Sequence, residues 1–349
     1  IQGRVYFQKV IENIGWLFFD KLFRMGVGLI VGIWVARYLG PEDYGTLGYA
    51  QAFVALFSTF ASLGLDSIVI RDIVNEPSCR DESLGTAFIL RLFGGFLTTI
   101  ICLSIIYFLR PGDILTFYLI GIIAVGTIFQ SFNVIDYWFS SQVQSKYTVY
   151  AQNTAFIIIS VVKVFLIINK SSLIAFAWAA LAEIIIGSLG LIFFYQFNGY
   201  SMHKWSISWI RAKKLLEQSW PLILSGLAIM IYMRIDQVML GQMQGDFSVG
   251  IYAAAVKISE IWYFIPTAIV ASLTPAIYNG KKISESLYYQ RLQKLFDILV
   301  MIAYGVALLM TFSSGWLISW LFGNEYKSAS SVLAIRGFCI TPFFLKSVQ

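Results

Sequence analysis

The sequence has few of the residues on which most soluble catalytic sites depend. It holds a single histidine, His203, three cysteines, and charged residues at only 13% of its 349 positions. One histidine excludes the His-Glu-x-x-His zinc motif, and Gly280-Lys281-Lys282 lacks the upstream glycine and the Ser or Thr of a phosphate-binding loop. The cysteines Cys79, Cys102 and Cys339 show no disulfide framework. We therefore predict no enzyme activity, no bound metal and no cofactor.

Hydrophobic residues fill the space that charge leaves. They make up 58% of the chain, against roughly 45–50% apolar usage in soluble domains. The apolar stretches run on for about twenty residues, the length that a helix needs to cross the hydrocarbon, instead of alternating as in a membrane β-barrel. Backbone groups in lipid must be satisfied within the segment, so the fold class is all-α, a polytopic membrane protein.

Apolar stretches between polar breaks define ten predicted spans. They are Ile14–Tyr38, Tyr44–Ile70, Leu84–Leu109, Ile114–Phe139, Tyr147–Ile168, Leu173–Tyr195, Leu215–Leu240, Val249–Tyr278, Leu295–Phe322, and Ser330 to the end.

The cations fall mainly on one side of these spans. With the amino terminus inside, inner loops and inner helix ends hold Arg4, Lys9, Arg80, Lys146, Lys204, Arg211, Lys213, Lys214, Lys281, Lys282, Arg291 and Lys294. The opposite loops hold Arg110, Lys170 and Lys327. Cationic loops resist translocation, so the amino terminus is predicted in the cytoplasm of a bacterial cell with the chain in the inner membrane. This asymmetry accounts for the net charge of +6 without a nucleic-acid partner.

The longest inner loop separates two predicted bundles. Residues 1–195 form the first, with six spans, and residues 215–349 form the second, with four. Residues 196–214 mix Trp205 and Trp209 with Lys204 and Lys213, as a helix lying on membrane lipids would. We predict an amphipathic cytoplasmic linker there.

An internal repeat relates the two bundles. Gly48-Tyr49-Ala50 is echoed by Ile251-Tyr252-Ala253, a shift of about 203 residues, and Trp16 with Trp220 gives about 204. A shift of six spans leaves both bundles in the same orientation. The same shift carries the end of the sixth span to about position 398, so the second bundle is expected to be incomplete in this chain.

Charged residues inside the spans are expensive in lipid and must face a watery cavity or pair with one another. Arg24, Arg91 and Arg234 offer planar forks that match phosphate oxygens, which favours an anionic cargo. Glu183 has no charged neighbour within a helical turn and is the first candidate for proton coupling. The further carboxylate candidates for ion coupling are Asp236 and Asp66.

Two bland alternatives stay open for these charges. Asp20 with Arg24, and Lys257 with Glu260, have the spacing of pairs on one helix face. Lys163 lies near a span end and could extend to the interface.

Four stretches are similar to the O-antigen and polysaccharide flippase family of the multidrug/oligosaccharidyl-lipid/polysaccharide exporter superfamily. They are Trp34 to Gly45, Leu63-Gly64-Leu65-Asp66 with Arg71, Leu84-Gly85-Thr86-Ala87, and Leu321 to Tyr326. The resemblance implies two six-helix bundles around a central cavity, alternating access, and export of undecaprenyl-pyrophosphate-linked oligosaccharide. It also implies that Arg24, Arg91, Lys163, Arg234 and Lys257 line a cationic cavity.

The expected partners are the lipid-linked oligosaccharide, membrane lipids, and a polysaccharide polymerase with its chain-length regulator. The alternatives are a cation-coupled drug exporter or a lipid II flippase of the same superfamily, and a membrane-embedded glycan polymerase or ligase. A drug exporter should favour carboxylates over arginines in its cavity. A polymerase needs a long outer loop, whereas these outer loops are about four to nine residues long.

The loop charges predict where reporter fusions will lie. Reporters fused after Arg211 and Arg291 should report cytoplasm, and reporters after Asp43 and Asp246 should report periplasm. Paired phosphatase and fluorescent-protein fusions measure this directly. A periplasmic signal after Arg211 would overturn the span assignment.

Overall fold

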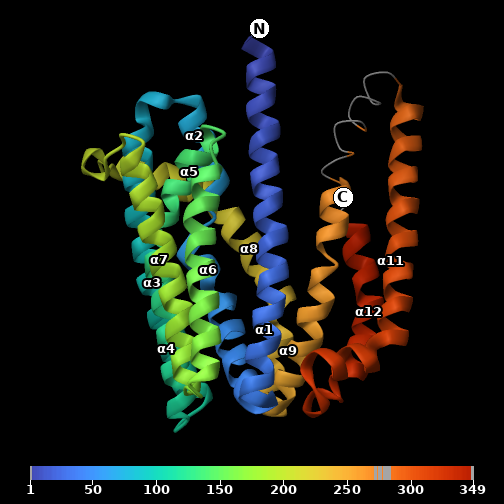
Figure 1. Cartoon of the computed structure of the whole chain (residues 1–349). Coiled ribbons are helices and arrows are strands. Elements are labelled where there is room, and N and C mark those ends of the chain that lie inside the picture. Colours follow the sequence, from blue (N-terminus) through green and yellow to red (C-terminus); the bar gives the residue numbers. More distant parts are fainter. Residues whose placement is uncertain (1, 271–272, 274–276, 278–283, 347–349) are drawn as a thin grey trace. The chain divides into compact units, whose positions relative to one another are not determined.

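The computed structural model describes residues 2–270, 273, 277 and 284–346, with side chains between Glu12 and Cys339 (Figure 1). All regular elements within those residues are helices, and eight are long and apolar enough to cross a membrane. The all-α polytopic prediction is confirmed. Lys281 and Lys282, and the side chains of Arg4 and Lys9, lie outside the described residues.

The long helices follow one another with short connections. They are α1 Gln2–Ser62, α2 Asp66–Asn75, α3 Arg80–Leu109, α4 Ile114–Phe129, α5 Val134–Ser141, α6 Lys146–Ile168, α7 Leu173–Phe197, α8 Trp209–Met243, α9 Asp246–Ile261, α11 Glu285–Phe322 and α12 Ala329–Lys346. Single 3-10 turns lie at Pro77–Cys79, Gln130–Asn133, Met202–Lys204 and Asn324–Tyr326.

Glycine and proline divide α1 into two spans. Gly40 has φ 72° and ψ 172°, a conformation that glycine adopts without strain, and Pro41 restarts the helix. The second span then ends at Ser62, because Leu63 and Gly64 both take positive φ, and α2 follows from Asp66. The continuous predicted span Tyr44–Ile70 is therefore wrong in its last third. The predicted span Ile114–Phe139 is likewise interrupted by the 3-10 turn at Gln130–Asn133.

The described chain divides into two compact units. The first comprises Ile1–Val35 and Thr46–Gly245, and the second Ala36–Gly45 and Asp246–Gln349. The helix α8, which the sequence assigned to the second bundle, packs within the first unit.

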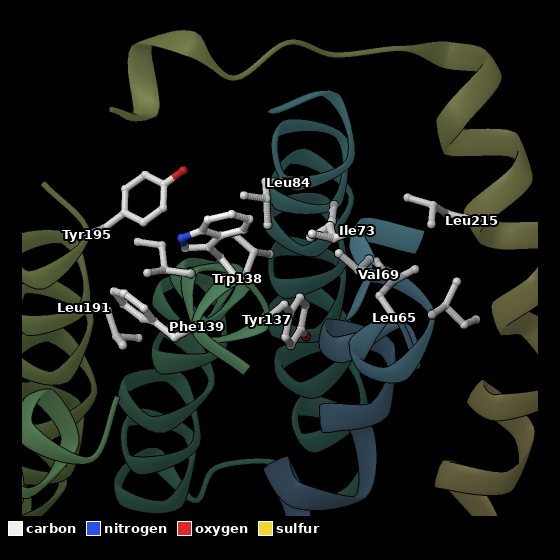
Figure 2. Close-up of a cluster of buried hydrophobic side chains, with 14 of the residues drawn as sticks. Leu65, Val69, Ile73, Leu84, Tyr137, Trp138, Phe139, Leu191, Tyr195 and Leu215 are labelled. Carbon is white, nitrogen blue, oxygen red and sulfur yellow. The ribbon is translucent and has the colours of Figure 1, made fainter. Parts of the chain in front are cut away.

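An apolar core closes one end of the first unit (Figure 2). It joins α2, α3, α5, α7 and the start of α8 through Leu65, Ile73, Leu84, Phe139, Tyr195 and Leu215, all of them fully or almost fully buried. Tyr195 also accepts a hydrogen bond from the indole nitrogen of Trp205, 3.1 Å away, so a buried hydroxyl is satisfied. This core fixes where α8 enters the unit.

The linker between the predicted bundles is not an amphipathic helix. After α7 ends at Phe197, the chain forms one 3-10 turn and then an extended strap up to Ser208. Trp205 packs against Phe88 and Tyr195 instead of facing lipid. The backbone N–H of Ser208 donates to the Thr86 hydroxyl at 3.1 Å. Tertiary contacts with α3 and α7 therefore outweigh the helical pattern.

The internal repeat is visible where two helix starts cross inside the second unit. Gly40 and Gly245 both take positive φ immediately before a helix start, and they are 205 residues apart. A Cβ on Gly45 would overlap the carbonyl oxygen of Asp246, and one on Gly250 would overlap that of Pro41. Gly45 and Gly250 are also 205 residues apart. The contact is reciprocal, and the register of the repeat is 205 here rather than the predicted 203.

Alanine at either crossing glycine should destabilise the protein. The added methyl meets backbone, which cannot rotate away, so Gly45→Ala and Gly250→Ala should each cost about 1–3 kcal/mol or more. Gly26→Ala on α1 is the matched control, because nothing lies within 4 Å of its added Cβ. Melting of the purified protein in detergent measures the difference. Equal melting temperatures for Gly45→Ala and Gly26→Ala would contradict the crossing.

Candidate functional site

Three of the predicted site residues meet in the first unit. The Glu183 carboxylate, on α7, lies between Nη2 of Arg24 on α1, at 3.4 Å, and Nζ of Lys163 on α6, at 3.3 Å. The three side chains keep between a fifth and a third of their surface accessible. Each lies inside a membrane-spanning helix, where such charges need partners. Two cations thus hold one carboxylate, and all three groups remain reachable.

Helical spacing brings the supporting residues to this cluster. Arg24 and Gly28 are one turn apart on α1, and both reach the ring of Phe156 on α6. The Arg24 guanidinium lies 5.1 Å from the ring centroid, and an added Cβ on Gly28 would be 3.6 Å from the ring. Lys163 is seven residues after Phe156, on the same face of α6. The cation–aromatic contact orients Arg24 toward α7.

A second pair of polar groups lies one turn earlier on the same two helices. Asp20 precedes Arg24 by four residues, and Asn153 precedes Phe156 by three. The side chains of Asp20 and Asn153 are in contact, yet the Oδ1 atom of each is buried and accepts no hydrogen bond from the described residues. Arg24 forms its ion pair with Glu183 and not, as the spacing allowed, with Asp20. Two buried acceptors are therefore available to a donor.

Arg91 is enclosed in a different cluster of the first unit. Only 5% of its side chain is exposed, and its guanidinium donates to Asp66, on α2, at 3.2 Å and to the Tyr137 hydroxyl on α5. Tyr137 donates to the same Asp66 carboxylate. This triad ties α2 and α5 to α3, so Arg91 has no free surface for a ligand in this structure.

Lys163 and Asp136 do not extend to the interface as their span ends allowed. Lys163 pairs with Glu183. Asp136 is held by Thr148, whose hydroxyl donates at 2.6 Å, and by Ser140. Both side chains turn inward, because neighbouring helices offer them partners.

The remaining candidates lie outside the Glu183 cluster. Arg234 and Asp236 are two residues apart on α8, and Asp236 accepts the backbone N–H of Gln237 at 2.8 Å. Lys257 lies on α9, in the second unit. Their predicted roles as lining residues, and that of Asp236 in coupling, stay predictions.

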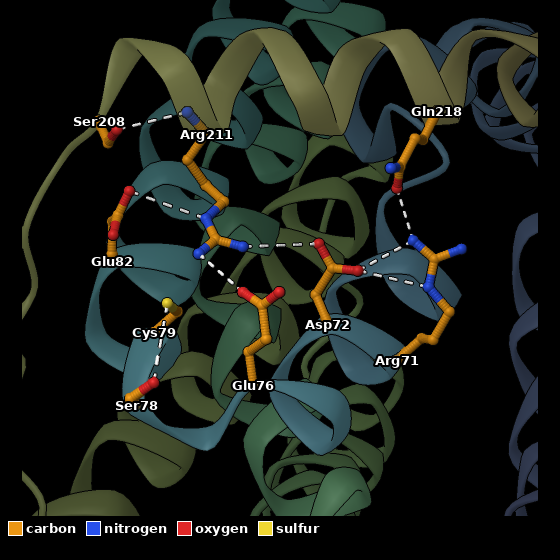
Figure 3. Close-up of polar contacts among 9 residues, drawn as sticks. All are labelled: Arg71, Asp72, Glu76, Ser78, Cys79, Glu82, Ser208, Arg211 and Gln218. Atoms are coloured by element: carbon orange, nitrogen blue, oxygen red, sulfur yellow. Dashed lines mark hydrogen bonds and ion pairs between the residues drawn. The ribbon is translucent and has the colours of Figure 1, made fainter.

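Sequence reasoning missed an arginine clasp at the start of α8 (Figure 3). Arg211, counted as a loop cation, is 8% exposed and points from α8 toward the α2–α3 turn. Its guanidinium lies 3.8 Å from Asp72, 3.5 Å from Glu76 and 3.7 Å from Glu82. Asp72 and Glu76 are one turn apart, but nothing in the sequence shows that their partner follows about 140 residues later.

A second clasp holds the other end of α8. Arg110, after α3, donates to the Gly241 carbonyl at 2.7 Å and lies 3.9 Å from the Tyr49 ring centroid. Burial would raise the pKa of Asp113 beside it, but hydrogen bonds from Thr116 and the Arg110 charge hold that pKa below its usual value. An arginine thus fixes each end of α8 to the first unit.

Comparison with known proteins supplies the family. The family model described as polysaccharide biosynthesis protein matches residues 10–281. The capsular polysaccharide biosynthesis protein CapF of Staphylococcus aureus is 20% identical over 333 residues, covering 94% of this chain and 81% of that protein.

Solved structures supply the fold. An inward-facing multidrug resistance transporter of the MATE family, in the MOP superfamily, has a TM-score of 0.68 at 18% identity, covering 93% of this chain and 78% of its own. An outward-facing structure of such a transporter has a TM-score of 0.64 at 18% identity, covering 97% and 81%. The protein is thus a multi-pass membrane protein with a MATE-like fold. Because the family model spans well over half of its length, it belongs to the polysaccharide biosynthesis protein family.

Proposed function

We propose that the protein is a flippase that moves lipid-linked polysaccharide precursors, with an undecaprenyl pyrophosphate carrier, from the cytoplasmic to the outer leaflet. The single observation that carries the proposal is the Arg24–Glu183–Lys163 cluster within the spans of the first unit. A prenyl tail is at home in lipid, so only the charged and glycosylated head needs a polar path. Family membership and the MATE-like fold support the same reading.

The cluster gives an anionic head a way to bind and to leave. Arg24 and Lys163 are the cations that match pyrophosphate oxygens, and Glu183 occupies both of them in the absence of cargo. A pyrophosphate therefore competes with Glu183 for the same two partners. Protonation of Glu183 removes the competitor and frees both cations, which links proton uptake to cargo binding.

The neighbouring acceptors suit a sugar. The buried Oδ1 atoms of Asp20 and Asn153 need donors, and sugar hydroxyls supply them. They lie one turn from Arg24 and Phe156, so a glycan joined to the pyrophosphate would reach them. We assign the coupling role to Glu183 over Asp66, because Asp66 is already bound by Arg91 and Tyr137.

The decisive experiment is an analysis of lipid-linked intermediates in a strain that lacks the protein. Accumulation of one undecaprenyl-linked glycan on the cytoplasmic side, relieved by the restored chain, is the expected result. Normal glycan export together with lost resistance to a cationic drug would instead support the drug-exporter alternative.

Replacing Arg24 should weaken the binding of anionic cargo. A charge-assisted hydrogen bond is worth about 1.5–3 kcal/mol, so Arg24→Ala should lower apparent affinity by about ten- to a hundredfold. Arg24→Lys keeps the charge without the fork and should fall between Ala and wild type. Glycan export at equal membrane levels is the measurement, with Lys170→Gln in a loop as the control. If Arg24 only neutralises Glu183, the double change Arg24→Gln with Glu183→Gln would export like wild type, and the cargo role would be lost.

Glu183→Gln should remove the pH dependence of binding. In the wild type, lowering the pH protonates Glu183 and releases Arg24 and Lys163, so binding should tighten as pH falls. The amide keeps the volume but does not compete as a charge, so binding should be tight at every pH while gradient-driven export declines. Titration of the purified protein with undecaprenyl pyrophosphate measures the first effect. Unchanged pH dependence in this variant would make Glu183 a structural residue.

A further inference from the structure

The start of α8 has two faces of different character. Arg211, Ala212 and Leu215 are buried against the first unit, and Figure 3 shows Arg211 pointing away from solvent into the α2–α3 carboxylates. The opposite face carries Trp209 and Ile210, each 86% exposed. Because Arg211 is occupied, it does not contribute to the outer face.

The outer face is also basic. Lys213 and Lys214 are exposed on α8, and Lys204 is exposed on the strap before it. The nearest carboxylate on this face, Glu217, lies 3.8 Å from Lys213 and offsets one charge. Glu76, Glu82 and Asp72 face Arg211 on the other side. The strip of Lys204, Trp209, Ile210, Lys213 and Lys214, here called the α8 basic strip, keeps a positive excess.

The orientation of this strip is fixed by the protein. The Ser208 hydroxyl accepts the backbone N–H of Arg211 at 3.3 Å, capping α8, and the backbone N–H of Ser206 donates to the Asp81 carbonyl at 3.3 Å. Trp205 is held by Tyr195. The tryptophan and lysines of the strip are therefore presented on a rigid helix start and not on a loose loop.

The length of α8 places the strip at the membrane surface. Its 35 residues extend about 52 Å, against a hydrocarbon core of about 30 Å. The charged residues lie within its first three turns, so those turns are the part outside the hydrocarbon. Tryptophan is enriched at the headgroup level, where lysine ammonium groups meet lipid phosphates.

We propose that the α8 basic strip binds anionic phospholipid headgroups, with Trp209 and Ile210 inserted at the interface and Lys204, Lys213 and Lys214 on the phosphates. Charge complementarity selects anionic over zwitterionic lipid, because an ammonium on the headgroup would repel the lysines. The inference is independent of the transported cargo.

Native mass spectrometry of the full-length purified chain tests this binding. Titration with phosphatidylglycerol should give tighter retention than titration with phosphatidylethanolamine. Each basic residue near an anionic surface strengthens binding about fivefold, so Lys213→Gln with Lys214→Gln should weaken phosphatidylglycerol binding by about five- to twenty-five-fold. Trp209→Ser should weaken the binding of both lipids.

The control is the double change Lys170→Gln with Lys327→Gln, which removes the same charge from two exposed loop positions. It should leave phosphatidylglycerol binding within about twofold of wild type. Equal retention of the two lipids by the wild type, or equal losses in the two double variants, would overturn the proposal. Circular dichroism of each variant confirms that the helices are intact, so a loss of lipid is not a loss of fold.

Discussion

A charged side chain inside a membrane span must find an opposite charge or a polar partner, and this constraint decides how the first unit is held together. Isolated, such a charge costs roughly 2.5–3.5 kcal/mol or more at the centre of the bilayer. Arg91 meets Asp66 and Tyr137, while Arg24 and Lys163 meet Glu183. Each pairing joins helices that are distant in sequence, so satisfying charge and packing helices are one process here.

The clusters differ in how completely they are closed. Arg91 is sealed by its partners and by the protein around it, which makes its triad a structural tie between α2, α3 and α5. The Glu183 cluster keeps accessible surface, and it has buried acceptors beside it. Buried structural pairs and reachable functional pairs use the same residue types. Their exposure separates them, and exposure assigns transport to the open cluster.

Arginine has a further role at the two ends of α8. Arg211 bridges carboxylates of the α2–α3 turn, and Arg110 reaches the last carbonyls of α8. The middle of α8 has little burial, so these end contacts and the apolar core at Leu215 attach it to the first unit. The same arrangement turns Trp209 and the lysines outward, which is why an interfacial surface exists even though the linker is not a helix.

The sequence by itself determined the fold class, the number of long apolar segments and the charge of the loops, because these follow from local composition and from the length of a membrane-crossing helix. It also located Arg24, Lys163 and Glu183 as unusual intramembrane charges. Only the tertiary structure decided that these three meet, that Arg91 is enclosed, and that Arg211 leaves its loop for three carboxylates. The repeat register of 205 also needed the crossing at Gly45 and Gly250. Partner choice between residues more than a hundred positions apart depends on how helices pack, and helix periodicity carries no information about that.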